Sequence, residues 1–218
     1  MEGYMTPRLI KIAGYVNKGE RLADIGTDHA YIPIYLVQKG IINEAIAADI
    51  NAAPLKTAAE NIKNAGLSRN IKTVLSDGFL CIDKNSFDTA VVAGMGGMLI
   101  AEILKNAPRQ KKYILQPMKN LPELKRFLSQ NGYKITTEGL AAEGEKIYNI
   151  LVAQDGNEVI SEYELFVGKG LADDPLLTLY KQSLKNKFEK IIKGNNQALN
   201  PNAKTIDYYK NLLTMLEK

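Results

Sequence analysis

The stretch from residue 21 to residue 33, RLADIGTDHAYIP, constrains the fold of this chain more strongly than any other. Its first half is short and largely apolar, and it ends in an acidic residue, Asp24, and a glycine, Gly26. Its second half opens a helix, because a proline such as Pro33 is tolerated in a first turn where no backbone N–H partner is needed. The pattern predicts a buried strand, a turn at Gly26 and a departing helix.

In an open parallel sheet, such a turn lies beside the ligand site, outside the carboxyl ends of the strands. The amides at the start of the helix attract an anionic group such as a ligand carboxylate. The dinucleotide fingerprint G-x-G-x-x-G does not fit, because Asp28 stands where a pyrophosphate needs bare backbone. An acidic residue suits a ligand with an ammonium group or hydroxyls, and S-adenosylmethionine has both, together with a sulfonium cation. A purely structural strand–helix turn is the alternative.

Length and composition narrow the class of protein. A chain of 218 residues, 45% hydrophobic and 24% charged, suits one soluble α/β domain with an appendage. No apolar run approaches the ~20 residues of a membrane span, and we expect no signal peptide. Cys81 is the single cysteine and His29 the single histidine, which excludes internal disulfides, argues against a Cys/His zinc site and suits a reducing cytoplasm. The net charge of +4 is compatible with an RNA partner.

Apolar runs and helical patterns alternate along the first part of the chain. Strands are predicted at residues 21–26, 44–50, 71–76, 87–93 and 112–116. Helices are predicted at residues 5–18, 30–38, 51–66 and 121–130. Strands that alternate with helices predict a parallel, doubly wound sheet.

The next two apolar runs, residues 133–138 and 146–154, are joined by a polar loop with a glycine and no helix. This pattern predicts an antiparallel pair at the edge of the sheet. A nicotinamide-binding domain usually ends without such a pair, whereas an S-adenosylmethionine-dependent methyltransferase domain usually ends with it.

The composition changes after residue 156, so we expect one domain at 1–156 and a second at 157–218. Residues 159–167 are predicted to be extended. Apolar residues then recur every three or four positions in 175–193 and 203–216, which predicts two amphipathic helices separated by a turn at 194–201 and paired as an antiparallel hairpin. The first of these helices is rich in lysines, at positions 181, 185, 187, 190 and 193.

Acidic residues stand at the ends of three successive predicted strands. Asp24 and Asp28 flank the first turn, Asp49 ends the second strand and Asp77 follows the third. Asp49 lies ~20 residues past the first turn, where an acid accepts both ribose hydroxyls of a nucleoside. Asp77 is placed to accept the adenine amino group. Each acid alone is better explained as a helix cap or a solvated loop residue, but together they favour an adenosine-containing ligand. The edge pair and Asp28 favour S-adenosylmethionine over NAD.

Four motifs match a known family. They are DIGTDHAYIP at 24–33, SDG at 76–78, AGMGGMLI at 93–100 and LQPM at 115–118. On these motifs the chain resembles the bacterial TrmK family, tRNA methyltransferases that use S-adenosylmethionine to methylate N1 of the adenine at position 22. The resemblance spans essentially the whole chain, including the C-terminal helical hairpin, which forms a coiled-coil-like second domain in that family. Met118 departs from the asparagine that we expect in many relatives.

The resemblance implies a class I methyltransferase fold: a Rossmann-like, mostly parallel sheet with an antiparallel edge hairpin, followed by a helical hairpin that binds tRNA. It implies cofactor contacts in the first turn, after the second and third strands and in the loop at 93–97. The candidate cofactor-binding residues are Arg8, Asp24, Gly26, Thr27, Asp28, His29, Asp49, Ile50, Asp77, Gly78, Ala93, Gly94, Met95 and Gly96. The candidate catalytic residues are Asp28, His29 and Met95.

The expected mechanism is direct attack of the adenine N1 lone pair on the sulfonium methyl. A carboxylate near the base would stabilise the cationic product and accept the N6 proton, and Asp28, followed by His29, is the candidate for that role. Positioning of the cofactor is the alternative role for both. The glycines of the loop at 93–97 would let the base approach the methyl group closely.

The expected RNA footprint combines the lysines of the C-terminal helix with basic residues near the fourth and fifth strands. The latter are Arg8, Lys11, Arg109, Lys111, Lys112, Lys119, Lys125 and Arg126. We expect a cytoplasmic monomer or weak dimer that binds tRNA, with no membrane and no metal. Two alternatives stay open, a small-molecule methyltransferase on the same fold and a non-catalytic RNA-binding protein.

Overall fold

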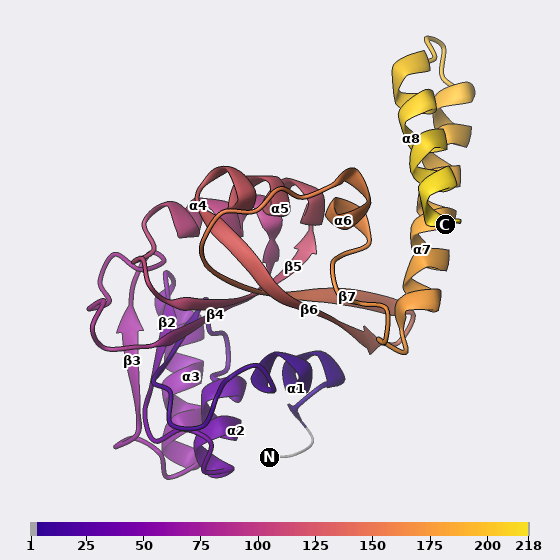
Figure 1. Cartoon of the computed structure of the whole chain (residues 1–218). Coiled ribbons are helices and arrows are strands. Elements are labelled where there is room, and N and C mark those ends of the chain that lie inside the picture. Colours follow the sequence, from indigo (N-terminus) through magenta and orange to yellow (C-terminus); the bar gives the residue numbers. More distant parts are fainter. Residues whose placement is uncertain (1–3, 218) are drawn as a thin grey trace. The chain divides into compact units, whose positions relative to one another are not determined.

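The structure is a computed structural model that describes residues 4–217. It divides into two compact units, an N-terminal unit of residues 1–158 and a C-terminal unit of residues 159–218. Figure 1 shows the sheet and its helices in the N-terminal unit, and a pair of long helices in the C-terminal unit.

The N-terminal unit is built on a sheet with the strand order β3-β2-β1-β4-β5-β7-β6. The strands are β1 (Leu22–Ile25), β2 (Ala45–Asp49), β3 (Ile71–Leu75), β4 (Thr89–Gly96), β5 (Lys112–Lys119), β6 (Tyr133–Glu143) and β7 (Lys146–Asp155). Strands β1 to β5 pair in parallel, and β7 pairs antiparallel with both β5 and β6. The predicted doubly wound sheet with an antiparallel edge pair is therefore confirmed.

Helices cover both faces of this sheet, as buried parallel strands require (Figure 1). The helices are α1 (Pro7–Ala13), α2 (Tyr31–Gln38), α3 (Ala52–Asn64), α4 (Gly97–Lys105) and α5 (Leu121–Gln130). Side chains of α1, α2 and α3 share one hydrophobic core with the strands, and Ile12, Leu36 and Ile62 lie within it. On the other face, the rings of Tyr113 and Tyr133 pack edge to face, and the Tyr133 hydroxyl donates to the Leu104 carbonyl of α4 at 3.2 Å.

Two helices of the N-terminal unit differ from the prediction. The first helix ends at Ala13 rather than at residue 18. Gly14 caps it by donating its N–H to the Ile10 carbonyl. Helix α4 was not predicted, because the run from Gly94 to Gly97 was interpreted as a loop. The structure instead continues β4 to Gly96 and begins α4 at Gly97.

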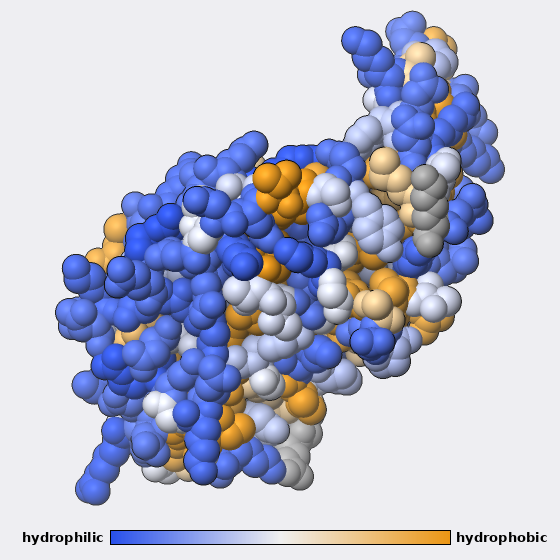
Figure 2. Space-filling view, viewed as in Figure 1, coloured by the Kyte–Doolittle hydropathy of each residue, from blue (hydrophilic) through white to orange (hydrophobic). Residues whose placement is uncertain are grey.

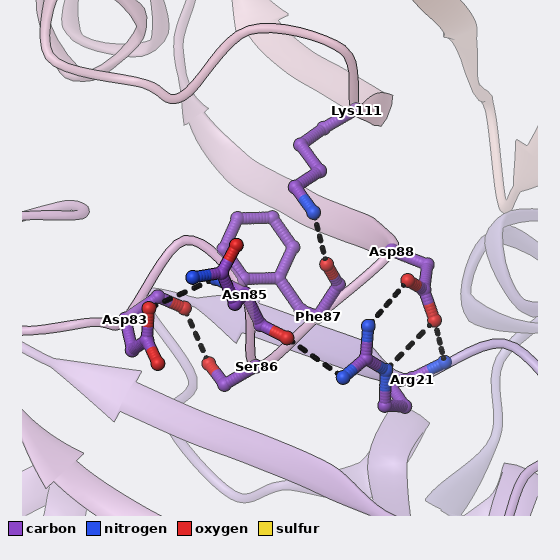
Figure 3. A network of polar contacts seen from close by, with 7 residues as sticks. All are labelled: Arg21, Asp83, Asn85, Ser86, Phe87, Asp88 and Lys111. Atoms are coloured by element: carbon purple, nitrogen blue, oxygen red, sulfur yellow. Dashed lines mark hydrogen bonds and ion pairs between the residues drawn. The ribbon is translucent and has the colours of Figure 1, made fainter.

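The amino ends of β1, β4 and β5 are joined by a network of polar contacts (Figure 3). Arg21 donates to both carboxylate oxygens of Asp88, at 3.0 and 2.7 Å, and to the Asn85 carbonyl at 2.7 Å. Hydrogen bonding to the Arg21 guanidinium lowers the pKa of Asp88 to about 2. Lys111 donates to the Phe87 carbonyl at 2.7 Å. These side chains hold the three strands together at their amino ends.

The C-terminal unit contains α6 (Glu162–Phe166), α7 (Leu177–Asn196) and α8 (Ala203–Leu216). The prediction of an extended segment at 159–167 is wrong, because Ser161 forms a capping box with Glu164 and starts a helix there. Helix α7 also continues through Gly194, so the predicted turn begins later. Helices α7 and α8 pack along each other (Figure 1), and Phe188 of α7 contacts Tyr209 of α8 with ring centroids 5.3 Å apart.

The surface seen in Figure 2 is mainly hydrophilic, with hydrophobic residues in small separate groups. None of the helices within residues 4–217 is both long enough and apolar enough to span a membrane.

Candidate active site

A cavity of about 400 Å³ opens beyond the carboxyl ends of β1 and β4. It is lined by the start of α1, by the turn between β1 and α2, and by Ala93 and Gly94 of β4. A cavity of this size accommodates a small organic molecule. Its position follows the general rule for open α/β sheets, in which ligands bind at the strand ends where the connections diverge.

The turn after β1 is held by backbone hydrogen bonds to the neighbouring strand. The N–H groups of Gly26 and Thr27 both donate to the Ala48 carbonyl, at 2.7 and 2.9 Å. Gly26 adopts a φ of +75°, which favours glycine, and a β carbon built there would collide with the Met95 methyl group. The Thr27 hydroxyl then accepts the Ala30 N–H at 3.1 Å, so the chain folds back before α2 begins.

Two carboxylates lie at the ends of adjacent strands. Asp24 of β1 and Asp49 of β2 are buried, and the Asp49 carboxylate accepts the Asn51 N–H at 2.7 Å. Burial raises the pKa of Asp24 to about 6, and the negative charge of Asp49 adds to this effect. A buried carboxylate with a raised pKa is prepared to receive a cation, because an ammonium group would compensate its desolvated charge.

Replacing Asp24 by asparagine is expected to remove a pH-dependent destabilisation of the ligand-free protein. The folded-state pKa of about 6 lies above the ordinary value of 3.8, so ionisation of Asp24 opposes folding. The wild-type free energy of unfolding should therefore fall relative to that of the variant between pH 4 and pH 6, by on the order of 2 kcal/mol, and stay level above that range. Urea denaturation across pH 4–8 measures the difference, and a constant difference would contradict the assignment.

Asp28 and His29 stand at the mouth of the cavity. The Nε2 atom of His29 lies 3.1 Å from an Asp28 carboxylate oxygen, and the two side chains are 39% and 70% exposed. The His29 ring stacks on Tyr31 with centroids 4.9 Å apart, and Tyr31 stacks in turn on Tyr4 at 5.4 Å. Asn61 of α3 donates to the His29 carbonyl at 3.0 Å and fixes the backbone of the turn.

Arg8 enters the cavity from the start of α1. Its Nη1 atom donates to Oε1 of Gln116 at 2.8 Å, and its Nε atom lies 3.3 Å from the Glu143 carboxylate. The guanidinium carbon lies 5.4 Å from the centre of the Tyr148 ring. These contacts place a positive charge in the same cavity as Asp24.

The chain matches the Methyltransferase domain family over residues 5–151. It is 32% identical over 184 residues to the tRNA (adenine(22)-N(1))-methyltransferase of Bacillus subtilis, an alignment that covers 83% of this chain and 77% of that protein. The chain belongs to the TrmK family.

Two solved structures carry the same family name. The TrmK structure from B. subtilis superposes with a TM-score of 0.85 at 27% identity and covers 97% of both chains. TrmK from M. capricolum, solved with the cofactor product S-adenosyl-homocysteine, superposes with a TM-score of 0.83 at 31% identity and covers 96% of this chain and 95% of that chain. The likeness therefore includes both the N-terminal unit and the C-terminal helices.

The structure gathers part of the predicted site around the cavity. The predicted residues that line it are Arg8, Asp24, Gly26, Thr27, Asp28, His29, Ala93 and Gly94. Asp49 lies one strand away, and its negative charge raises the pKa of Asp24. The Met95 methyl group packs against Gly26. Gly96 faces Lys119, whose Cε atom is 3.2 Å from a β carbon built at that glycine.

Three further predicted residues also lie outside the cavity lining. Ile50 is 58% exposed beyond β2, and Asp77 is exposed beyond β3. Gly78 faces helix α4, since a β carbon built there would lie 3.2 Å from Ile103.

Several site residues were missed by the sequence analysis. Tyr4, Thr6 and Tyr31 line the cavity, and Gln116 contacts Arg8. Tyr31 belongs to the motif at 24–33, so its place in the motif was an available signal. A polar residue within the apolar run of β5 was the signal for Gln116.

The expected RNA footprint in the N-terminal unit is partly wrong. Lys125 and Lys112 are buried in ion pairs, with Glu138 and Glu20, at 2.7 Å each. Arg109, Lys111 and Lys112 lie at the amino end of β5, on the sheet edge opposite the cavity. Lys119 is exposed at the carboxyl end of the same strand, where a substrate can reach it.

Exposed apolar side chains lie near the carboxyl ends of the parallel strands. Met98 and Leu99, in the first turn of α4, are 58% and 53% exposed, and Met118 near the end of β5 is 46% exposed. Leu80, after β3, is 65% exposed. Exposed apolar side chains are suited to contact the face of a flat ring, as in nucleobase-modifying enzymes.

Proposed function

We propose that this protein transfers a methyl group from S-adenosylmethionine to N1 of adenine 22 in tRNA. The observation that carries the proposal is the cavity that joins Asp24, Arg8 and the turn at 26–29, in a chain that TrmK structures match over nearly its whole length. The protein works in the cytoplasm as a monomer or weak dimer, and its chemistry needs no metal.

The charges of the cavity suit the cofactor. Asp24 accepts the ammonium group, and Arg8 pairs with the carboxylate of the methionine part. Asp49 accepts the ribose hydroxyls, and Asp77 with the backbone of Gly78 faces the adenine ring. When bound, S-adenosylmethionine supplies an electrophilic methyl group on a sulfonium, which the N1 lone pair of adenine attacks directly.

The chain itself contributes alignment and charge. Gly94 leaves room for the target base, because a β carbon built there would have no neighbour within 4 Å, and Met95 packs against Gly26. Asp28, held against His29, faces the cationic product, stabilises its charge and accepts the N6 proton. The exposed apolar side chains at Met98 and Met118 contact the base.

The C-terminal unit, residues 159–218, supplies the tRNA-binding surface. Lys187, Lys190 and Lys193 of α7 are exposed, so they are available to phosphates. Lys181 instead lies over the Tyr163 ring, and Lys185 lies 3.8 Å from Glu217. Of the five lysines in the expected RNA footprint of this helix, we therefore assign these three exposed ones to phosphate contacts.

The deciding experiment combines the protein, methyl-labelled S-adenosylmethionine and an unmodified tRNA transcript with adenine at position 22. Nuclease digestion should yield labelled 1-methyladenosine, and a transcript with guanine at position 22 should yield none. Labelling of both transcripts would move the target to another position. Absence of label from both would contradict the proposed activity.

Replacing Asp49 by alanine is expected to weaken S-adenosylmethionine binding by roughly 1–3 kcal/mol, because two ribose hydroxyls lose a charged acceptor. Isothermal calorimetry measures the dissociation constant. Asp83 is a suitable control for removal of a carboxylate, because it lies in the loop before β4 at the opposite edge of the sheet. An unchanged dissociation constant for the Asp49→Ala variant would remove this residue from the site.

A further inference from the structure

Gln116 is a fully buried side chain of β5 that contacts two different parts of the site. Its Oε1 atom accepts a hydrogen bond from Arg8 Nη1 at 2.8 Å and another from the Gly94 N–H at 3.1 Å. Its Nε2 atom donates to the Pro117 carbonyl at 3.0 Å and lies 3.6 Å from the Met118 sulfur. A single amide group thus joins the start of α1, the end of β4 and the end of β5.

The contact with Gly94 replaces a missing hydrogen bond between β4 and β5. The register between β4 and β5 passes from Ala93↔Gln116 to Met95↔Pro117 and skips Gly94, which adopts a φ of +78°. A residue bulged out of a ladder loses its regular hydrogen-bond partner. The side-chain Oε1 atom of Gln116 accepts the Gly94 N–H in its place and so determines where the bulged end of β4 lies.

The contact with Arg8 acts on the other side of the cavity. The arginine side chain is long and flexible, so the direction of its planar guanidinium depends on the groups that it contacts. Gln116 accepts a hydrogen bond from its Nη1 atom, and the Glu143 carboxylate lies 3.3 Å from its Nε atom as an ion-pair partner, so the hydrogen bond and the ion pair together orient the guanidinium. Arg8, Asp24 and Gly94 all line the same cavity, which makes their relative placement a property of the site.

We propose that Gln116 is a positioning residue for methyl transfer. Its side-chain Oε1 atom holds Arg8, on the cofactor side of the cavity, in a fixed position relative to the Gly94 backbone, on the target-base side. The inference rests on the proposed function. Gln116 itself does not line the cavity and takes no part in bond making. Its effect reaches the reaction through Arg8 and through the bulged end of β4, where a small displacement lowers the rate strongly.

The test compares two substitutions with a buried control. Gln116→Met keeps the length and the apolar packing but removes the shared acceptor. Gln116→Glu keeps an acceptor oxygen at the same length, so the contacts with Arg8 and Gly94 can form, while the donor to the Pro117 carbonyl is lost. Thr89→Val, at the other end of β4, is the control, since Thr89 is equally buried and lies away from the site.

Turnover is measured at saturating cofactor with varied tRNA, and S-adenosylmethionine affinity is measured separately by calorimetry. We expect Gln116→Met to lower kcat at least 10-fold and S-adenosylmethionine affinity about 10-fold, with the KM for tRNA within twofold of wild type. Gln116→Glu should recover kcat to within threefold of wild type, and Thr89→Val should remain within twofold in all three measurements.

Two results would overturn the inference. One is a Gln116→Glu variant as impaired as Gln116→Met, and the other is a loss of kcat in Gln116→Met that only follows a lowered melting temperature. Failure of the proposed function is distinguishable, because it would appear as wild-type protein without activity on the adenine-22 transcript. The calorimetric comparison between Gln116→Met and Thr89→Val decides the positioning of Arg8 in that case as well.

Discussion

Replacement of Lys187, Lys190 and Lys193 by glutamine is expected to weaken tRNA binding about 100-fold near physiological salt. These lysines are exposed on α7, whose apolar face already packs against α8, so their charges are free to neutralise phosphates. Each lost phosphate contact should flatten the slope of log affinity against log salt by about one unit. Filter binding of a tRNA transcript across a salt series measures both quantities, and S-adenosylmethionine affinity should not change.

A control variant removes the same charge from the N-terminal unit. Lys18, Lys63 and Lys84 are exposed near the amino edge of the sheet, away from the cavity. Their replacement by glutamine should leave the salt slope within about half a unit of wild type. Equal losses in the two triple variants would show that net charge alone matters. A wild-type affinity and slope in the α7 variant would contradict the tRNA-binding role of this helix.

Replacement of Gly97 by alanine is expected to lower kcat about 100-fold and the free energy of unfolding by about 1–3 kcal/mol. A β carbon at Gly97 would collide with the Asn120 carbonyl oxygen and lie 3.0 Å from the Lys119 carbonyl oxygen. Because these are backbone atoms, they cannot rotate away as a side chain can. The start of α4 must therefore move away from β5, and it displaces the end of β4, to which it is directly joined.

Gly14 provides the matched control for this substitution. It adopts a φ of −63° at the end of α1, and a β carbon there would lie at an ordinary 3.4 Å from the Lys11 carbonyl oxygen. Gly14→Ala should change stability by less than about 0.5 kcal/mol and leave kcat near wild type. Single-turnover rates and urea denaturation measure the pair of variants. A Gly97→Ala enzyme with wild-type turnover would show that the position of the backbone at the end of β4 does not limit the reaction.

Local sequence determined the elements and the central turn of this protein. The short apolar run before Gly26 forms a buried strand, because its side chains must leave water on both faces of a covered sheet. Gly26 adopts a positive φ, as the turn requires, and Asp24 and Asp28 fall on either side of it. The amphipathic spacing of the C-terminal helices likewise depends on neighbours a few residues apart, so the sequence alone was sufficient to predict their pairing.

Tertiary structure decided which distant residues meet. Lysines usually lie at the protein surface, yet Lys112 and Lys125 are buried and form ion pairs with Glu20 and Glu138. Gln116 reaches Arg8, which is 108 positions away, because α1 packs against β6 and β7, the strands that continue the sheet beyond β5. Periodicity reports which face of an element is buried, but it carries no record of which element covers that face. The cavity and its charge pattern depend on that second choice, so only the folded chain could reveal them.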